Sequence, residues 1–285
     1  MIFRIFMFTM LVSTAVWAQD KPAYRLFTKE GKAVDFERMI QSLSNADVVL
    51  FGELHDNAIS HWLELQVTKD LYGGNPAITM GMEMFEADDQ IVLTEYLQGI
   101  IEEKHLLSEA KVWDNYKNDY KPLIEFAKEK KLDVVATNIP RRYANLVFRK
   151  GTDALTHLPA EAKQWIAPMP VEIDLSLPGY KDMMAMSGHG SNMSGENMAK
   201  SQAMKDATMA YFILKNRKDL FLHFHGSYHS QNYEGIGWYL KKADPKIKIA
   251  TIHTVEQESV SSLDEKNKDV ADFIICVPKD MTKTY

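Results

Sequence analysis

The amino-acid sequence predicts an α/β protein, in which a mainly parallel β-sheet is flanked by helices and a smaller α-helical lid lies beside it. Six short apolar runs have the length and composition of strands that are buried on both faces. Segments of helical periodicity lie between several of them, and a strand–helix–strand order with right-handed crossovers builds a parallel sheet. The composition agrees, because 46% of the 285 residues are hydrophobic and 25% are charged, as in a globular protein with a sizeable core.

The predicted strands are rich in Val, Ile, Leu and Phe, and they cover residues 47–51, 78–82, 133–136, 220–224, 247–252 and 273–277. Two connecting segments have a clear helical pattern. Residues 58–72 place apolar side chains such as Ile59, Trp62 and Leu63 mostly on one face, and residues 122–131 show similar spacing. Each of these helices leads into the next strand, as in a parallel α/β unit.

Two segments interrupt the alternation of strand and helix. Residues 87–121 contain two successive helical patterns without a strand, and residues 152–215 contain four prolines followed by a Met-rich helix over about 197–216. We expect both to be helical insertions that cover one end of the sheet, within a single domain over residues 19–285.

The N-terminus predicts an exported protein. Residues 1–18 carry one cation, a short apolar stretch and small residues before Ala18, which is typical of a cleaved signal peptide. The alternative, a membrane anchor, is disfavoured because the apolar run is shorter than the ~20 residues that a bilayer requires. We expect a periplasmic or outer-membrane-associated protein with no integral membrane segment. The single cysteine, Cys276, lies in the last predicted strand, so no lipobox cysteine follows the signal.

Charge and cysteine content exclude several classes of protein. The chain has 33 Lys and Arg against 39 Asp and Glu, a net charge of -6, which disfavours non-specific nucleic-acid binding. One Cys excludes a disulfide framework and Cys-based zinc or iron–sulfur sites. Nine His and 16 Met leave imidazole and thioether chemistry open.

Ionisable side chains follow four of the predicted strands. Because ligands bind beyond the carboxyl ends of parallel strands, these positions predict a shared functional pocket. Its expected members are Glu53, His55, Glu83, Arg141, Arg142 and His229. Two Gly-x-x-His tetrads end in His55 and His229, and we expect each glycine to let the chain turn sharply off its strand.

The pocket residues have expected roles. Glu53 and Glu83 can orient the two imidazoles by accepting a ring N–H. The arginine pair after Pro140 can bind a carboxylate or phosphate at a helix start. A purely structural alternative stays open, in which His55 is a hydrogen-bonded structural residue and Glu83 is the buried partner of an arginine.

The other histidines form two groups. His223 and His225 alternate within one strand and therefore point to the same face, where they either pack in the sheet or extend the pocket. The remaining four have no motif around them and are expected at the surface or in helix packing: His61, His105, His157 and His253.

Five motifs occur in a set order over roughly residues 35–278: Gly52-Glu-Leu-His55, Met82-Glu-Met-Phe85, Thr137-Asn-Ile-Pro-Arg-Arg142, Gln202-Ala-Met-Lys-Asp-Ala-Thr-Met-Ala210, and Gly226-Ser-Tyr-His229 followed by Gly235-Ile-Gly. Together they resemble the ChaN-like haem-binding proteins, whose superfamily includes Tiki metalloproteases, TraB proteins and erythromycin esterases. The resemblance implies a parallel α/β domain with a smaller helical domain and a role in iron acquisition. It also implies haem held where two subunits of a homodimer meet, ligated by a tyrosine with a histidine nearby. Family members are commonly outer-membrane lipoproteins, and the missing cysteine departs from that pattern.

The haem hypothesis selects further candidate residues. No Cys-x-x-Cys-His is present, so haem b would be held without a covalent bond. Methionines such as Met184 and Met186 are concentrated after Tyr180, and flexible thioethers suit an adaptable contact surface for haem. We expect Tyr180 to ligate the iron and His189 to lie nearby, with rival ligands Tyr143, Tyr228 and Tyr233. The loop around His189 could instead bind Cu(I).

A metal-dependent hydrolase is the alternative function. The superfamily resemblance implies peptidases or esterases that use Gly-x-x-His and glutamate. In that case His55, His229, Glu53 and Glu83 would hold one divalent ion such as zinc, which activates a water molecule. The chain is an enzyme under this alternative and a haem carrier, not an enzyme, under the first hypothesis.

Overall fold

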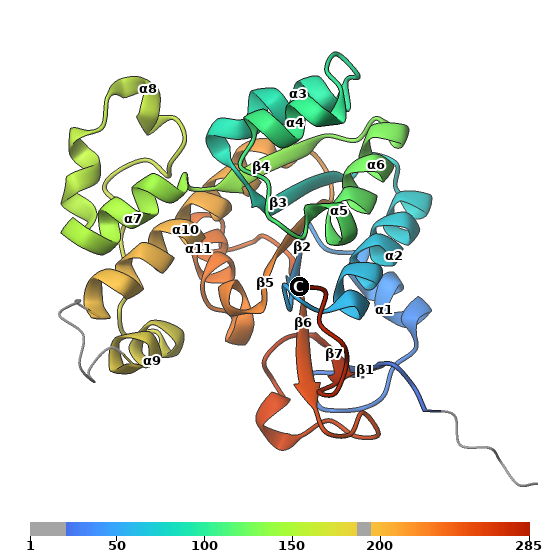
Figure 1. Cartoon of the computed structure of the whole chain (residues 1–285). Coiled ribbons are helices and arrows are strands. Elements are labelled where there is room, and N and C mark those ends of the chain that lie inside the picture. The colour runs from blue at the N-terminus through green and yellow to red at the C-terminus, as the bar shows by residue number, and fades with distance from the viewer. Residues whose placement is uncertain (1–20, 187–194) are drawn as a thin grey trace, which may run out of the picture.

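The computed structural model describes residues 21–186 and 195–285, and its centre is a seven-stranded sheet of order β1-β7-β6-β2-β5-β3-β4 (Figure 1). All strand pairs are parallel except β1 with β7. The strands are β1 (Arg25–Thr28), β2 (Val48–Glu53), β3 (Thr79–Glu86), β4 (Val134–Asn138), β5 (Phe221–Gly226), β6 (Ile249–Gln257) and β7 (Phe273–Pro278). The predicted α/β class and all six predicted strands are confirmed. Only β1 was not predicted, because it is short and not a purely apolar run.

Helices connect and cover the strands. They are α1 (Phe36–Leu43), α2 (Ala58–Gly74), α3 (Gln90–Leu97), α4 (Glu103–Glu109), α5 (Tyr116–Asp119), α6 (Lys121–Lys130), α7 (Arg141–Lys150), α8 (Ala160–Lys163), α9 (Pro178–Met186), α10 (Gly195–Asn216) and α11 (Ile236–Ala243). A 3₁₀ turn, η3 (Ser227–His229), follows β5 directly. Asn57 caps α2, since its side chain accepts hydrogen bonds from the backbone N–H groups of Ile59 and Ser60.

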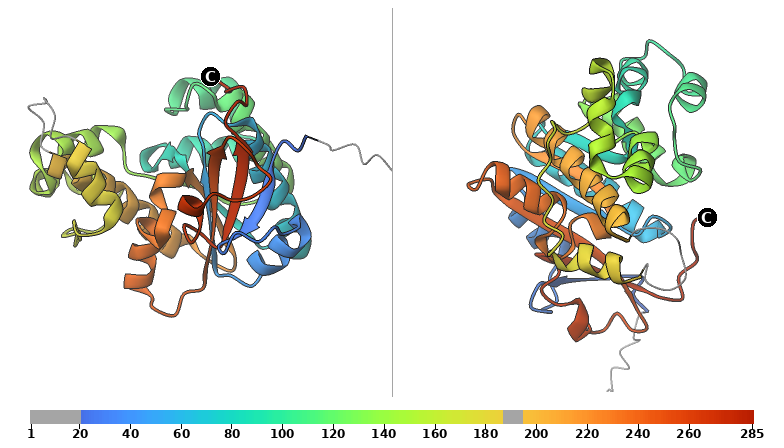
Figure 2. Two further views of the ribbon diagram at one scale, coloured as in Figure 1. Left: turned by 90° about the horizontal axis from the view of Figure 1, so that it is seen from below. Right: turned by 90° about the vertical axis from the view of Figure 1, so that its left-hand side faces the viewer.

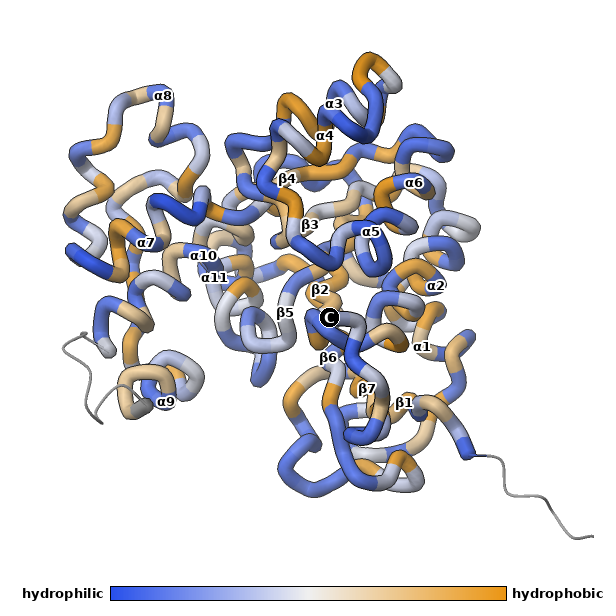
Figure 3. Tube along the Cα trace, in the orientation of Figure 1, coloured by the Kyte–Doolittle hydropathy of each residue, from blue (hydrophilic) through white to orange (hydrophobic). Residues whose placement is uncertain are grey.

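The sheet separates two apolar layers because successive side chains of a strand point to opposite faces. On one face, Val49 and Phe51 of β2 pack in the larger core with α1, α2 and α6. On the other face, Val48 and Leu50 pack with α10 and α11. In Figure 3 the hydrophobic colour follows β4, while hydrophobic and hydrophilic colours alternate along the surrounding helices. Both layers continue to the carboxyl ends of the strands, where their character changes from apolar to polar.

Helices α7, α8 and α9 lie beside the sheet, where α7 and α9 pack against α10 (Figures 1 and 2). They contribute two small apolar clusters, one around Ile139, Val147 and Met204, and another around Tyr180 and Ala199. The start of α9 contacts the segment just before α11, where the Gly179 N–H donates to Glu234, 2.8 Å away. This side layer is where the sequence predicts a lid.

Cys276 is fully buried in β7, in the strand expected for it. In residues 21–186 and 195–285, no helix is both long enough and apolar enough to cross a bilayer.

Candidate functional site

Polar side chains gather where β2, β5 and β3 end, and these three strands are neighbours in the sheet. Glu53 is the last residue of β2 and faces the same side as Phe51 of the larger core. Glu83 lies between Met82 and Met84, which face that core, so its own side chain points to the α10 side. His229 follows β5 in η3. The predicted pocket is therefore two polar clusters, one on each face of the sheet.

Glu53 organises the cluster on the α2 face. Its Oε1 accepts a hydrogen bond from the Tyr120 hydroxyl at 2.7 Å and lies 2.5 Å from His55 Nδ1. Its Oε2 lies 3.2 Å from Nδ1 of His61, one turn into α2. Burial alone would raise the pKa of Glu53, but the hydrogen bonds with His55 and His61 hold it well below its usual range.

His61 is buried among acids, which the sequence did not indicate. Its Nδ1 is 3.3 Å from Glu64 Oε2, and its Nε2 is 3.0 Å from the carbonyl oxygen of His55 and 3.6 Å from Asp119 Oδ2. Burial would lower the pKa of His61, but its hydrogen bonds with Glu53 and Glu64 raise it to about 11. The pKa of Glu64 is raised well above its usual range by burial and by the charge of Glu53. Both effects favour the neutral form of the Glu64 carboxyl.

His229 organises the cluster on the α10 face. Its Nε2 is 3.2 Å from Glu83 Oε1 and its Nδ1 is 2.6 Å from Asp206 Oδ1. The Tyr180 hydroxyl donates to the other oxygen of Asp206 at 2.7 Å, and the Gly226 N–H donates to Glu83 at 2.9 Å. Burial would lower the pKa of His229, but the charges of Glu83 and Asp206 raise it to about 10. His229 is therefore a buried imidazolium at neutral pH.

His55 is the accessible group of the site, with 36% of its side chain exposed. Its ring lies against Gly226 and meets Trp113 edge to face at 4.8 Å between centroids. Burial would lower the pKa of His55, but its hydrogen bond with Glu53 raises it. Glu53 thus orients His55, and Glu83 binds His229, as the sequence predicts for these two carboxylates.

The motif glycines act differently from the sequence prediction. Neither Gly52 nor Gly226 has a positive φ, so a sharp glycine-dependent turn off the strand is wrong. A β-carbon on Gly52 would lie 3.0 Å from the Ser227 backbone and 3.1 Å from the carbonyl oxygen of Ile252. Both glycines supply space rather than an unusual backbone conformation.

Three more histidines lie on the α10 face. His223 and His225 point the same way, as predicted, with their Nδ1 atoms 2.9 Å apart, and Thr137 bonds His223 Nε2 at 2.7 Å. His225 and His253 both lie in register with Gly52 from the neighbouring strands. Burial lowers the pKa of His225 to about 3 and of His253 to about 4, so both are neutral. His253 is thus a buried sheet residue, not a surface one, whereas His105 and His157 are exposed as expected.

The arginine pair lies outside the polar clusters. The guanidinium of Arg142 is 2.6 Å from Asp88 Oδ2 and lies over the ring of Tyr143, 4.5 Å from its centroid. Arg141 is exposed at the first position of α7. The predicted anion position inside the pocket is therefore not formed by these side chains, because Arg142 pairs with Asp88 and Arg141 faces solvent.

The predicted haem residues fall into different environments. Tyr180 is 3% exposed, and its hydroxyl is bound to Asp206. Tyr228 is half-buried, and its hydroxyl donates to the Gly179 carbonyl at 3.3 Å and to Met183 Sδ at 3.9 Å. Met184 packs against the cluster of Tyr180. His189 lies outside the described residues, as does the side chain of Met186.

The predicted metal ligands do not converge on one point. Both ring nitrogens of His229 face carboxylates, and Nδ1 of His55 faces Glu53. Within the described ranges, two groups have ligand atoms that all lie within 4.8 Å of one another: Glu53 with His61 and Glu64, and Glu86 with Asp88 and Asp89. The quartet of His55, His229, Glu53 and Glu83 is not among them, so it does not fit a single divalent ion.

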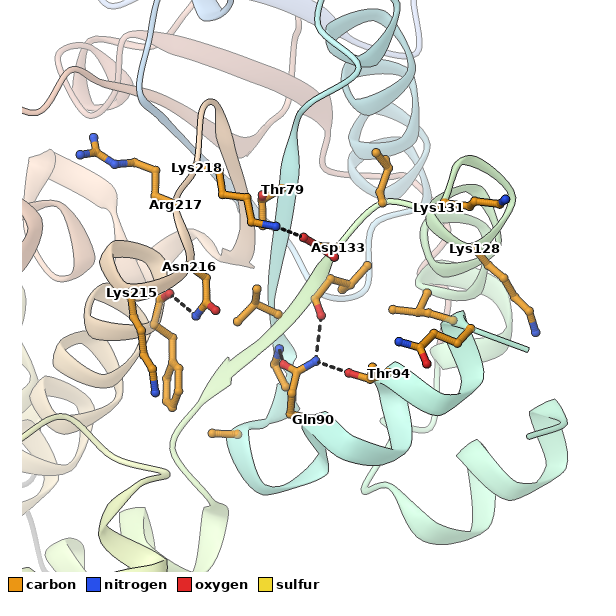
Figure 4. A pocket seen from close by; sticks show the side chains of 18 of the residues that line it. Thr79, Gln90, Thr94, Lys128, Lys131, Asp133, Lys215, Asn216, Arg217 and Lys218 are labelled. Atoms are coloured by element: carbon orange, nitrogen blue, oxygen red, sulfur yellow. Dashed lines mark hydrogen bonds and ion pairs between the residues drawn. The ribbon is translucent and has the colours of Figure 1, made fainter. Parts of the chain in front are cut away.

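A large cavity of about 1010 Å³ lies elsewhere, along the free edge of β4 (Figure 4). Its wall includes Thr79 and Val134, the first residues of β3 and β4, so it lies toward the amino ends of the strands. The Gln90 side chain donates to the Val134 carbonyl at 3.0 Å and accepts from the Ala136 N–H at 2.7 Å. The Gln90 amide thus makes the hydrogen bonds that a further strand would make with β4. At the rim of the cavity, Lys218 pairs with Asp133.

The sequence reasoning missed His61, Glu64, Tyr120 and Asp206. A signal exists for two of them, because His61 and Glu64 are three residues apart in a predicted helix and so share a face. Asp206 could have been noticed as a lone acid between Met204 and Met209 in an otherwise apolar helix stripe. Nothing local marks Tyr120 as the partner of Glu53.

Comparison with known proteins gives a family and a fold. The model of the family described as haem-binding uptake, Tiki superfamily, ChaN, matches residues 39–240. The solved structure of cofacial heme binding to ChaN of Campylobacter jejuni is 18% identical, covers 88% of this chain and 96% of its own, and gives a TM-score of 0.67. The structure of an erythromycin esterase, EreC in its open conformation, is 11% identical in sequence. That match covers 90% of this chain and 97% of the esterase chain, with a TM-score of 0.50. No curated protein matches this chain.

Proposed function

The chain belongs to the ChaN family of haem-binding uptake proteins in the Tiki superfamily, and from this we propose that it binds haem non-covalently and serves haem or iron uptake. The family match over residues 39–240 carries the proposal. The residues fit such a ligand, since a single buried cysteine cannot attach haem covalently and exposed or half-buried tyrosines and methionines are present beside α10. When bound, haem would supply an iron centre, and a tyrosine oxygen of this chain would hold it.

The hydrogen bonds of the tyrosines near α9 indicate which of them could ligate iron at the smaller cost. Ligation by Tyr180 would remove the hydrogen bond that its hydroxyl gives to the buried Asp206 carboxylate. Tyr228 has weaker partners, a carbonyl at 3.3 Å and the Met183 sulfur at 3.9 Å, so its phenol can be redirected at smaller cost. We therefore place Tyr228 ahead of Tyr180 as the iron ligand, with Met183 and Met184 as part of the apolar contact surface.

A second candidate surface for haem lies on α7. Tyr143 is partly buried there, and Arg142 lies over its ring and 3.4 Å from its hydroxyl. A guanidinium at this place can stabilise a phenolate and bind a propionate carboxylate. Tyr143 is the competitor that the experiment must separate from Tyr228.

We further propose that haem is held between two subunits, and the arrangement of α9 supports this. A helix such as α9 can cover only one face of a planar ligand. Ligand sites usually bury most of the ligand surface, so the other face needs a second cover. A second copy of the chain would cover the opposite face, as in a two-fold symmetric dimer. Helices α7 to α9 would then act as a lid that is completed by the partner.

Hemin titration tests the proposal directly. We expect a saturable Soret band and a mass change from monomer to dimer in analytical ultracentrifugation. The band should shift or weaken in Tyr228→Phe, and stay in Tyr180→Phe and Tyr143→Phe. His189→Ala tests the predicted nearby histidine in the same assay. A titration without saturation would reject haem binding, and loss of the band only in Tyr143→Phe would move the ligand to α7.

A hydrolase is the second candidate, and the oriented, exposed ring of His55 favours it. Glu53 holds Nδ1 of His55, which leaves Nε2 of the same ring to act as a general base. The imidazolium of His229 supplies a positive charge on the opposite face of the sheet. Hydrolysis of nitrophenyl esters or of a casein peptide mixture tests this function. Turnover that is lost in His55→Ala and kept in Tyr228→Phe would support it.

Export is also part of the proposal. The first 18 residues have the composition of a signal peptide, so the mature chain would begin after Ala18. Intact mass of the protein recovered from the periplasm tests the cleavage, and recovery of the full-length chain from the cytoplasm would contradict it.

A further inference from the structure

Glu53, His61 and Glu64 form a closed polar cluster between the end of β2 and the first turns of α2. His61 and Glu64 are three residues apart on α2, so both point from the same face of the helix toward Glu53. All three side chains are buried, with exposures of 4% for His61 and 0% for each glutamate. Their potential ligand atoms lie within 4.8 Å of one another.

Neighbouring groups outside the cluster fix the orientation of Glu53 and His61. Tyr120 donates to Oε1 of Glu53, and His55 Nδ1 lies beside the same oxygen, which leaves Oε2 toward His61. Nε2 of His61 is 3.0 Å from the His55 carbonyl, so Nε2 keeps its proton when a metal ion displaces the proton on Nδ1 and takes the lone pair there. A histidine that donates one ring N–H to a carbonyl and offers the other nitrogen is the usual arrangement of a metal ligand.

The spacing suits a small divalent ion. Nδ1 of His61 is 3.2 Å from Glu53 Oε2 and 3.3 Å from Glu64 Oε2. In a tetrahedral zinc site with bonds of about 2.0–2.1 Å, neighbouring ligand atoms are about 3.3 Å apart. Two of the three atom pairs thus already have the separation that one ion would require, and the third lies within 4.8 Å.

An unsatisfied buried oxygen adds an independent observation. Among the described residues, Oε1 of Glu64 is a completely buried oxygen without a hydrogen-bond partner, and the buried Oε2 of Glu53 has only its 3.2 Å contact with His61 Nδ1. Burying two carboxylates beside one imidazole is costly unless a cation or protons neutralise them. Asp119, 3.6 Å from His61 Nε2, adds a further acid to the same surroundings.

We propose that Glu53, His61 and Glu64 bind one divalent transition-metal ion, with zinc the best match to their nitrogen and oxygen donors. This site excludes His55 and His229 as ligands. Its ion would be separated from His55 by the Glu53 carboxylate alone, and would fix that carboxylate in place. The site lies on the α2 face of the sheet, so it is independent of haem bound at α9 or α7.

Metal binding by the purified full chain tests the site. The chain is stripped with chelator and refolded from urea with or without zinc, which allows loading even though the cluster is closed. We expect one zinc per chain by elemental analysis, a higher Tm, and a visible cobalt(II) spectrum typical of four-coordination. Glu64→Gln and His61→Gln should each remove the bound metal. Tyr120→Phe should weaken it on the order of 10–100-fold, as for other groups that orient a ligand.

Two controls keep the result interpretable. Glu86→Gln changes the other acidic group and should retain one zinc per chain. Glu64→Gln should fold, because glutamine is a neutral isostere of Glu64, whose pKa is raised by burial and by the charge of Glu53, and far-UV circular dichroism checks this. Absence of bound metal in the folded wild-type chain after refolding with zinc would overturn the site. So would metal that persists in Glu64→Gln and disappears in Glu86→Gln.

Discussion

The ring of His55 fills the space that a β-carbon on Gly226 would need: such a carbon would lie 2.7 Å from Nε2 and 2.9 Å from Cε1 of the imidazole. The glycine of the second Gly-x-x-His tetrad therefore makes room for the histidine of the first. The Gly226 N–H also donates to Glu83, so one glycine contacts both polar clusters. The two tetrads are parts of one structure, although they are far apart in the sequence.

Gly226→Ala should displace the His55 ring and weaken its bond with Glu53. We expect a loss of roughly 1–3 kcal/mol in the free energy of unfolding, as for other overpacked sites. Urea denaturation measures the loss, and the imidazole resonances of His55 in NMR spectra report the displacement. In the His55→Ala background the same substitution should cost much less. Gly73→Ala, where nothing lies within 4 Å of the added carbon, is the control and should be neutral or stabilising. Equal losses in both backgrounds would contradict the steric account.

Tyr180→Phe should destabilise the fold because it removes a donor to the buried carboxylate of Asp206. A lost bond to a buried charged group costs roughly 1–3 kcal/mol. Tyr233→Phe is a matched control, since its hydroxyl bonds Asp272 at 3.1 Å but the residue is 42% exposed. Urea denaturation of both variants at neutral pH makes the comparison. A Tyr180→Phe chain as stable as the control would show that Asp206 does not need the phenol.

Stability should fall above neutral pH through His229. Its pKa is about 10 in the folded chain, above the 6.5 of an ordinary histidine, so folding favours the protonated ring. This contribution is complete below about pH 6.5 and is lost as the pH rises toward 10. The free energy of unfolding of the wild-type chain should therefore decline more steeply between these pH values than that of His229→Gln. Parallel curves for the two proteins would refute the assignment.

Gln90→Ala should expose the edge of β4. The Val134 carbonyl and the Ala136 N–H both lose their partner, which we expect to cost roughly 1–3 kcal/mol in unfolding free energy. An unpaired edge strand also invites association, so the variant should form more oligomer on heating, as light scattering would show. Gln98→Ala, an exposed residue on the same cavity wall, should leave both properties unchanged. If Gln98→Ala had the same effects, the edge-capping role would be wrong.

Local patterns predicted the elements well. Helix α2 was expected at residues 58–72 and runs over Ala58–Gly74, and α10 was expected over about 197–216 and runs over Gly195–Asn216. The predicted strands differ from the observed ones mainly at their ends, where polar residues such as Glu53 and Gly226 still belong to the ladder. These elements are predictable because apolar periodicity is a property of a short window of sequence.

Partners at the site were harder to predict. Glu53 and Glu83 were recognised as orienting groups, yet Asp206 on α10 and Tyr120 before α6 were not. Tyr120 bonds Glu53 across 67 positions of sequence, and Asp206 reaches His229 from a helix whose apolar stripe suggested only packing. Arg142 was expected in the pocket and instead pairs with Asp88. No local pattern encodes such distant pairs.

The sequence by itself determined the α/β class, the strands and their polar carboxyl ends. Burial requires a pattern of apolar residues that can be recognised within a short stretch of sequence. Only the tertiary structure decided that β2, β5 and β3 lie side by side, and that their charged residues divide between the two faces of the sheet. Strand order and register are long-range properties, and a shift of one residue would move each side chain to the opposite face. That register, with α2 packed on one face and α10 on the other, places His61 beside Glu53 and His229 between Glu83 and Asp206.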